Sequence, residues 1–177
     1  MTDQELVLAA KGSGKGEYFG ALYDRYFQPI YRFIYYKTHH RETAEDITST
    51  VFTKALANLA GLDLAKGTFQ AWLYQIARNA VIDHYRNRSA RPTADIADAW
   101  DIPADARLEK DAANVLLFDD LQKYLHLLSA DQREIIILRI WEELSYAEVA
   151  DIVGKSEASC KMAFGRGIKK LQELMPV

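Results

Sequence analysis

Three polar side chains of different chemistry recur at helical spacing in the segment Phe69–Arg88. Asn79, Asp83 and Arg86 stand at positions i, i+4 and i+7, which share one face of an α-helix. An amide, a carboxylate and a guanidinium in one row can hydrogen-bond to the edges of unpaired bases. Arg86 and Arg88 also add charges suited to phosphate at the end of this segment. The segment is therefore a candidate site for nucleic acid.

A second candidate lies near the C-terminus, where two short helices are predicted on either side of a turn. Ser145 and Glu148 form a capping box, Gly154 suits a helix C-terminus, and Ser156 caps the next helix. This pattern predicts a helix-turn-helix whose second helix enters a major groove, although a helical hairpin with a solvated basic face remains an alternative. The face that would meet DNA consists of Ser159, Met162, Ala163, Arg166 and Lys170, with Lys161 and Lys169 at its edges.

The distribution of charge supports a nucleic-acid partner better than the total does. The chain of 177 residues carries a formal net charge of −3, which is unfavourable for phosphate binding. Residues 155–170, however, hold 5 basic and 1 acidic side chains, and residues 1–88 hold 11 basic and 9 acidic ones. Residues 89–112 hold 3 basic and 6 acidic side chains. The positive charge thus coincides with the two candidate sites.

Helices are the elements that must position these side chains. No stretch alternates apolar and polar residues for long, and no Asn-Gly or Asp-Gly hairpin occurs. We expect Pro29 to kink or interrupt the long aromatic helix in which it lies. The predicted helices are a short one capped by Thr2 and Glu5, then Glu17–Lys37, Glu42–Leu59, Phe69–Asn87, Ala112–Leu127, one capped by Ser129 and Gln132, the one capped by Ser145, and Ser156–Leu174.

These helices group into two small all-α domains. Residues 1–88 and 112–177 carry the apolar periodicity, and residues 89–111 carry Pro92, Pro103 and many Ala and Asp residues instead. The middle segment is interpreted as a flexible acidic linker, and whether it is only a solvated spacer or has an ordered role stays open. The predicted fold is therefore two helical domains joined by this linker, the second a helix-turn-helix.

Composition excludes several classes of function. Cys160 is the only cysteine, so no internal disulfide can form, and its place on an apolar stripe indicates core packing. No cluster of metal ligands, Walker loop or paired catalytic carboxylates stands out, so we expect no metal, no cofactor and no enzymatic activity. The acidic start lacks the apolar core of a signal peptide, and apolar runs are too short for a membrane span. A cytoplasmic protein is expected.

Two glycines leave a question that the sequence does not answer. Gly165 and Gly167 lie within the last predicted helix, where each costs about 1 kcal/mol relative to alanine. Either they allow another backbone or side chain to come close, or this helix is less stable than most.

Taken together, these segments resemble the extracytoplasmic-function (ECF, group 4) sigma factors of the sigma-70 family, the promoter-specificity subunits of bacterial RNA polymerase. Phe19–Lys37 resembles region 2.1, and Ala44–Phe52 resembles region 2.2. Phe69–Arg88 resembles regions 2.3 and 2.4, with Trp-Leu-Tyr-Gln-Ile-Ala-Arg-Asn close to the family pattern. Leu127–Glu134 and Leu144–Ala150 resemble region 4. The motifs occur in the family's order, with an acidic linker between them.

The resemblance implies a role for each matched segment. The linker would lead toward the active-site channel of the polymerase, and the partners would be the β′ and β subunits, promoter DNA and an anti-sigma factor. The expected site residues are Asp46, Ser49, Thr50 and Phe52 for docking on the β′ clamp helices; Asn79, Asp83, Arg86 and Arg88 for the −10 element as its non-template strand is unpaired; Gly61, Leu62, Asp63, Lys66 and Thr68 in a loop that accepts a flipped-out base; and Ser159, Lys161, Met162, Ala163, Arg166 and Lys170 for the −35 duplex.

The second domain departs from the family pattern in its charge. The family often has Lys-Ser-Arg and then Arg-Ala-Arg in this helix, where the chain has Lys161-Met162-Ala163 and Arg166-Gly167-Ile168. Two cationic contacts are therefore missing, and −35 binding is expected to be weaker or differently specific. Two alternatives to a sigma factor are a stand-alone helix-turn-helix regulator and a sigma-like adaptor that sequesters an anti-sigma protein.

Overall fold

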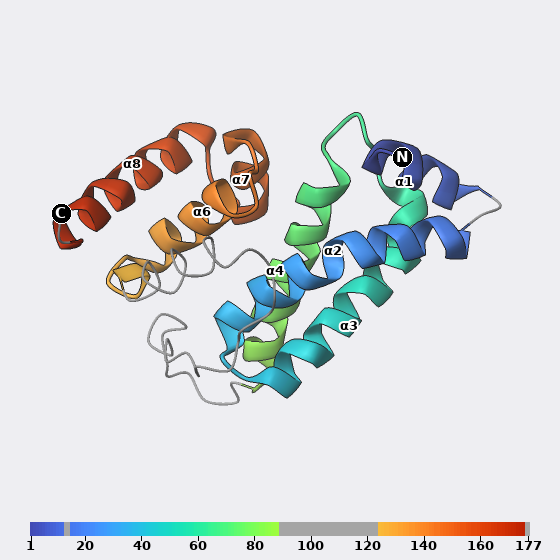
Figure 1. The fold of residues 1–177 in the computed structure, drawn as a ribbon, viewed down its shortest axis with the longest axis horizontal. Coiled ribbons are helices and arrows are strands. Elements are labelled where there is room, and N and C mark those ends of the chain that lie inside the picture. The colour runs from blue at the N-terminus through green and yellow to red at the C-terminus, as the bar shows by residue number, and fades with distance from the viewer. Residues whose placement is uncertain (13–14, 89–123, 176–177) are drawn as a thin grey trace. The chain divides into compact units, whose positions relative to one another are not determined.

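The structure is a computed structural model that describes residues 1–12, 15–88 and 124–175. Within these ranges every regular element is a helix and no strand occurs, which confirms the predicted all-α fold (Figure 1). The chain divides into two compact units, residues 1–93 and 94–177. The predicted linker 89–111, and residues 112–123 of the helix expected after it, lie outside the described residues. The domain limits at residues 88 and 111 therefore stay predictions.

The first unit is a bundle in which a long central helix packs against the others (Figure 1). Thr2 and Glu5 form the predicted capping box: the Thr2 backbone N–H donates to Glu5 Oε2 at 2.8 Å, and Glu5 N–H donates to Thr2 Oγ1 at 3.3 Å. The elements of this unit are α1 (Asp3–Lys11), α2 (Lys15–Thr38), α3 (Arg41–Asn58), a 3₁₀ helix (Leu59–Gly61) and α4 (Phe69–Arg88).

The helix α2 continues through Pro29, so of the kink or interruption expected there, the interruption is absent. Proline removes one backbone donor and disfavours a helix interior. Here the side chains on both sides of it are buried: Leu22 precedes Pro29, and Ile30 and Ile34 follow it, all fully buried. The apolar stripe is therefore held in the core along its whole length, and tertiary packing outweighs the local cost of the proline.

Aromatic contacts fix α4 against α2 in the core of the first unit. The rings of Phe33 and Tyr74 meet edge to face with their centroids 5.1 Å apart, and Tyr26 lies 5.5 Å from Phe69. Both geometries are favourable for aromatic pairs. Tyr74 is fully buried. These contacts orient α4 by its apolar side and leave its polar row on the outside.

The second unit contains the predicted helix-turn-helix. Its described helices are α6 (Ala130–Ile140), α7 (Tyr146–Val153) and α8 (Glu157–Leu174). Gly154 ends α7 with a φ of +70°, a left-handed conformation that favours glycine, and its N–H donates to Ala150 O at 2.9 Å. The capping boxes of Ser129 with Gln132 and of Ser145 with Glu148 are both present. The capping and turn residues of the sequence therefore set these helix ends.

Gly167 marks a close approach between α8 and α6. A Cβ atom at Gly167 would lie 2.7 Å from Ile136 Cδ1 and 3.4 Å from Gln132 Cβ. Ile136 is itself fully buried in a cluster with Leu125, Leu128 and Leu171. At Gly165, by contrast, nothing lies within 4 Å of an added Cβ atom. Close approach therefore explains Gly167, and nothing in the structure explains Gly165.

Candidate nucleic-acid interface

The polar row of α4 faces solvent, as the helical spacing predicts. Asn79, Asp83 and Arg86 are all exposed. The remaining sides of the helix hold its buried side chains, which are Phe69, Ala71, Leu73, Tyr74, Ala77, Ala80 and Val81, while Trp72 and Ile76 are half-buried. The side chain of Arg88 lies outside the described residues. The structure thus presents an amide, a carboxylate and a guanidinium together on one accessible surface.

Two aromatic residues at the edges of this surface are interpreted from the sequence as core. Tyr85 is half-buried, and its hydroxyl donates to the backbone oxygen of Lys37 at 3.0 Å, which ties α4 to the end of α2. Trp72 is also half-buried, and its ring lies 5.8 Å from that of Phe69. Both rings therefore combine a packing role with partial exposure.

The loop between the 3₁₀ helix and α4 is folded on itself by short-range hydrogen bonds. Asp63 Oδ1 accepts from Ala65 N–H at 3.1 Å, and Asp63 O accepts from Lys66 N–H at 3.0 Å. Thr68 Oγ1 accepts from Ala71 N–H at 3.2 Å and so caps the first turn of α4. Of the five predicted loop residues, Leu62 is buried, and Gly61, Asp63, Lys66 and Thr68 are exposed.

A contact from α1 to this loop was not predicted from the sequence. Lys11 Nζ donates to the backbone oxygen of Leu62. The two residues lie 51 positions apart in the chain, so no local pattern signals the contact. The first helix thereby fixes the start of the loop that precedes α4.

The predicted polymerase-docking residues do not all lie on one surface. Asp46, Ser49 and Thr50 are exposed on α3. Phe52 is instead buried, with its ring 4.8 Å from that of Tyr23. The expectation that Phe52 lies on the docking surface is therefore wrong, because its aromatic side chain fills the contact between α3 and α2 and supports the exposed residues from inside.

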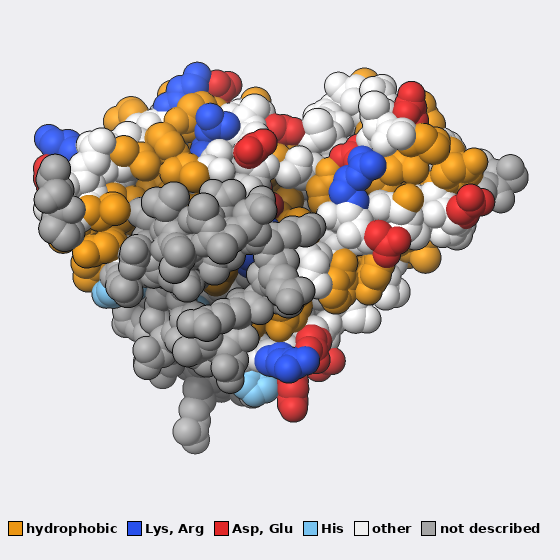
Figure 2. Space-filling view, viewed as in Figure 1, with side chains coloured by type: hydrophobic (Ala, Val, Ile, Leu, Met, Phe, Trp, Pro, Cys, Tyr) orange, Lys and Arg blue, Asp and Glu red, His pale blue; other side chains and the backbone are white. Residues whose placement is uncertain are grey.

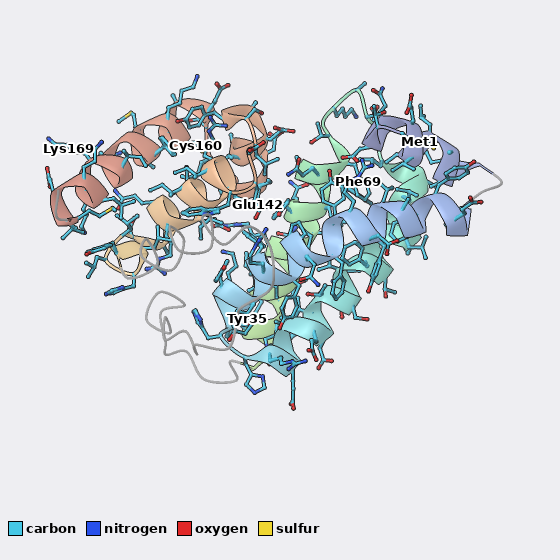
Figure 3. The ribbon with its side chains drawn as sticks, viewed as in Figure 1. Met1, Tyr35, Phe69, Glu142, Cys160 and Lys169 are labelled. Atoms are coloured by element: carbon cyan, nitrogen blue, oxygen red, sulfur yellow. The ribbon has the colours of Figure 1, made fainter. Side chains whose placement is uncertain are left out.

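The predicted recognition face of α8 is exposed over most of its length. Ser159, Lys161, Met162, Arg166 and Lys170 are exposed, and Ala163 is half-buried. The opposite side holds Cys160, which is fully buried, and burial raises the pKa of its thiol above the usual value. Cys160 is therefore a packing residue, as its place on the apolar stripe predicts (Figure 3).

Two lysines of α8, and one just before it, have partners within the second unit. Lys161 Nζ lies 2.6 Å from Glu157 Oε1, and Lys170 Nζ donates to the backbone oxygen of Leu127 at 2.6 Å. Lys155, just before the helix, pairs with Asp131. On the face shown in Figure 2, basic side chains along α8 alternate with acidic and hydrophobic ones. The exposed side of the helix is therefore mixed in character and not uniformly basic.

Tyr146, which connects α6, α7 and α8, was not singled out from the sequence either. Tyr146 shares the i, i+3, i+4, i+7 spacing of the apolar residues of α7, and its ring contacts Arg139 of α6 and Lys161 and Phe164 of α8. Arg139 precedes the ring by seven residues and Lys161 follows it by fifteen, across two helix ends, so helical periodicity does not connect them.

Family models identify both units. Residues 22–91 match the model of Sigma-70 region 2, and residues 118–171 match that of Sigma-70, region 4. The ECF RNA polymerase sigma factor BldN of Streptomyces coelicolor is 36% identical over 97% of this chain, which spans 65% of the length of BldN. The RNA polymerase sigma factor YlaC of Bacillus subtilis is 30% identical over 87% of this chain and 90% of its own.

Solved structures agree with this fold. CnrH, in complex with the cytosolic domain of CnrY, matches with a TM-score of 0.69 and 24% identity, over 97% of this chain and 96% of its own. The sigma factor RpoE of Bartonella quintana, in complex with the anti-sigma factor NepR, matches with a TM-score of 0.67 and 26% identity, over 88% and 95%. The chain belongs to the sigma-70 family, as an RNA polymerase sigma factor of the ECF group, and not to a family of enzymes. None of the helices in the described part of the chain is long and apolar enough to span a membrane.

Proposed function

We propose that this chain binds core RNA polymerase in the cytoplasm and directs it to promoters through two separate DNA contacts. The observation that carries the proposal is the exposed row of Asn79, Asp83 and Arg86 on α4, in a unit that matches Sigma-70 region 2. Their hydrogen-bonding groups lie on the outer face of a helix whose other side is fixed in the core. The row reads the unpaired non-template strand of the −10 element.

The loop before α4 receives a flipped-out base of the same strand in this proposal. Flipping a base costs a few kcal/mol of stacking and pairing, which a pocket repays by hydrogen bonds and stacking. Asp63, Lys66 and Thr68 are exposed next to the start of α4, and Trp72, in the first turn of α4, is half-buried. The hydrogen bonds inside the loop support this role, since a preformed loop loses less entropy on binding.

The second DNA contact is made by α8 in the major groove of the −35 duplex. Arg166 and Lys161 are the main polar contacts, Ser159 and Lys170 flank them, and Met162 adds an apolar one, since its side chain is 60% exposed. Because Lys155 and Lys170 already have protein partners, the contribution of this unit to affinity is small. The −35 contact therefore adds to a complex that polymerase and α4 already hold.

The exposed residues Asp46, Ser49 and Thr50 on α3 dock on the clamp helices of the β′ subunit, and an anti-sigma factor competes for the chain. The complex of the related RpoE with NepR supports an anti-sigma partner. A stand-alone helix-turn-helix regulator is less well supported, because such a protein needs no region 2 match over residues 22–91. A sigma-like adaptor would bind an anti-sigma factor without starting transcription.

The residue assignments are tested by transcription with core polymerase on three templates: an intact promoter, one with an altered −10 element and one with an altered −35 element. Asn79→Ala should reduce discrimination against the altered −10 element and leave the −35 preference intact. Arg166→Ala should do the reverse, with a loss of about 1–3 kcal/mol of −35 discrimination.

Each variant serves as the control for the other in this experiment, because both proteins carry one alanine substitution at an exposed helical position. If the wild type and both variants transcribe the three templates equally, the residue assignments are refuted and the family membership stays intact. A chain that gives no promoter-specific transcript at all would favour the adaptor.

A further inference from the structure

The ring of Tyr146, the first residue of α7, is surrounded by charged and aromatic groups from both neighbouring helices. The Arg139 guanidinium carbon lies 4.4 Å from the ring centroid, and Lys161 Nζ lies 5.7 Å from it. The ring of Phe164 meets it edge to face at 5.8 Å. Both cations are within the distance at which an aromatic face attracts positive charge. One side chain thus links α6, α7 and α8 at the start of α7, the first helix of the helix-turn-helix.

The contact with Arg139 fixes the ring. Arg139 Nη1 donates to the backbone oxygen of Leu144, just before the cap of α7, and the side chain is half-buried. A guanidinium held by a carbonyl and stacked on a ring has little freedom left. Edge-to-face packing on Phe164 supports the ring from α8. Tyr146 is therefore a rigid platform.

The other cation on the platform is free to exchange partners. The side chain of Lys161 is 56% exposed, and its ion pair with Glu157 is an i, i+4 pair at the surface. Such pairs contribute little and are screened by salt, so a phosphate can replace the carboxylate. Lysine has a flexible stem that loses entropy when it is held in one place. A ring beside the ammonium already restricts the lysine side chain in the free protein, so less entropy is lost when DNA binds.

We propose that Tyr146 is a positioning residue for Lys161: its ring holds the ammonium at the edge of α8, where Lys161 exchanges Glu157 for a phosphate of duplex DNA. The inference deepens the proposed −35 contact and rests on it. Tyr146 acts here through its ring and not through its hydroxyl. The other cations of this region are placed differently, since Lys155 pairs with Asp131 and Lys170 bonds to Leu127.

The test is the salt dependence of binding between the full-length chain and a short, labelled, mixed-sequence DNA duplex. Removal of one lysine–phosphate interaction reduces the slope of log affinity against log salt by about one. Over a fourfold range of salt, one such interaction changes the affinity ratio by about threefold. We expect Tyr146→Leu and Lys161→Gln each to lower the slope by about one, and the double variant to lower it no further. Tyr146→Phe should keep the wild-type slope.

Lys169→Gln is the matched control, because Lys169 is an exposed lysine of the same helix (Figure 3). Its effect on the slope should add to that of Tyr146→Leu. Circular dichroism checks that each variant is folded. If the leucine variant unfolds, Tyr146→Met replaces it, since methionine keeps an apolar contact with Phe164 but has no ring.

Two results would overturn the inference while leaving the proposed function in place: additive reductions of the slope in Tyr146→Leu/Lys161→Gln, or a reduction in Tyr146→Phe as large as in Tyr146→Leu. A third result would count against the proposed function itself. If Lys161→Gln, Lys169→Gln and Arg166→Ala all leave the slope unchanged, α8 does not contact duplex DNA.

Discussion

Arg133 carries a charge in the core of the second unit, where the residue is only 5% exposed in relative terms. Its Nε donates to Leu125 O at 3.0 Å, and Nη2 donates to His126 O at 3.2 Å and Leu128 O at 3.1 Å. Burial lowers the pKa of the guanidinium, which the carbonyl partners help to keep charged. The side chain therefore satisfies the backbone just before α6.

We predict that Arg133→Met lowers the free energy of unfolding of the second unit by about 3 kcal/mol, because three backbone carbonyl oxygens are left without this donor. Lys155→Met is the control, since it removes only an exposed ion pair with Asp131 and should cost less than about 1 kcal/mol. Urea denaturation of the two variants measures both values. Equal destabilisation would show that the bonds of Arg133 do not stabilise the unit.

For single residues, the exposure of a side chain could be predicted from the sequence better than its contacts with other side chains. The spacing of Asn79, Asp83 and Arg86 implied a shared face, and all three are exposed. Phe52 was misplaced, since the family resemblance carried no information on its packing against Tyr23. The partners of Tyr146 lie on other helices and could not be deduced from helical spacing.

For whole elements, helix ends followed from capping chemistry, and helix interiors followed from periodicity. The capping boxes at Thr2, Ser129 and Ser145 are local and were therefore predictable. Of the kink or interruption predicted at Pro29, the interruption does not occur, because the cost of proline is local, whereas the packing that offsets it comes from α3 and α4. The role of Gly167 could not be deduced from the sequence, because it depends on a close approach to Ile136, which lies 31 positions earlier in the chain.

The two glycines of α8 give a matched stability test. We predict that Gly165→Ala raises the free energy of unfolding by up to about 1 kcal/mol, because alanine favours helix and nothing lies within 4 Å of the new Cβ atom. Gly167→Ala should be less stable than Gly165→Ala by about 1–3 kcal/mol, because its Cβ atom meets the buried side chain of Ile136.

Chemical denaturation in parallel provides the comparison. If Gly167→Ala stabilises the chain as much as Gly165→Ala does, Ile136 moves aside without cost, and α8 does not depend on this close approach for its position on α6.

For the whole molecule, the charge distribution bears on the two DNA contacts that we propose. The net charge of −3 opposes unaided binding to duplex DNA, and residues 155–170 concentrate 5 basic side chains against 1 acidic one. Linking two modest contacts raises their combined affinity when the distance between them is set. In our proposal the polymerase sets that distance, with α8 upstream and α4 downstream.

In our proposal, the chain selects promoters only as a subunit of RNA polymerase. The most direct measurement is transcription of a library of bacterial promoter fragments by core polymerase, with and without the chain, together with footprinting by the chain alone. We predict a distinct set of start sites that appears only with both components, and no sequence-specific footprint without polymerase. Specific protection of promoters by the chain alone, or failure to bind core enzyme at micromolar concentration, would contradict the account.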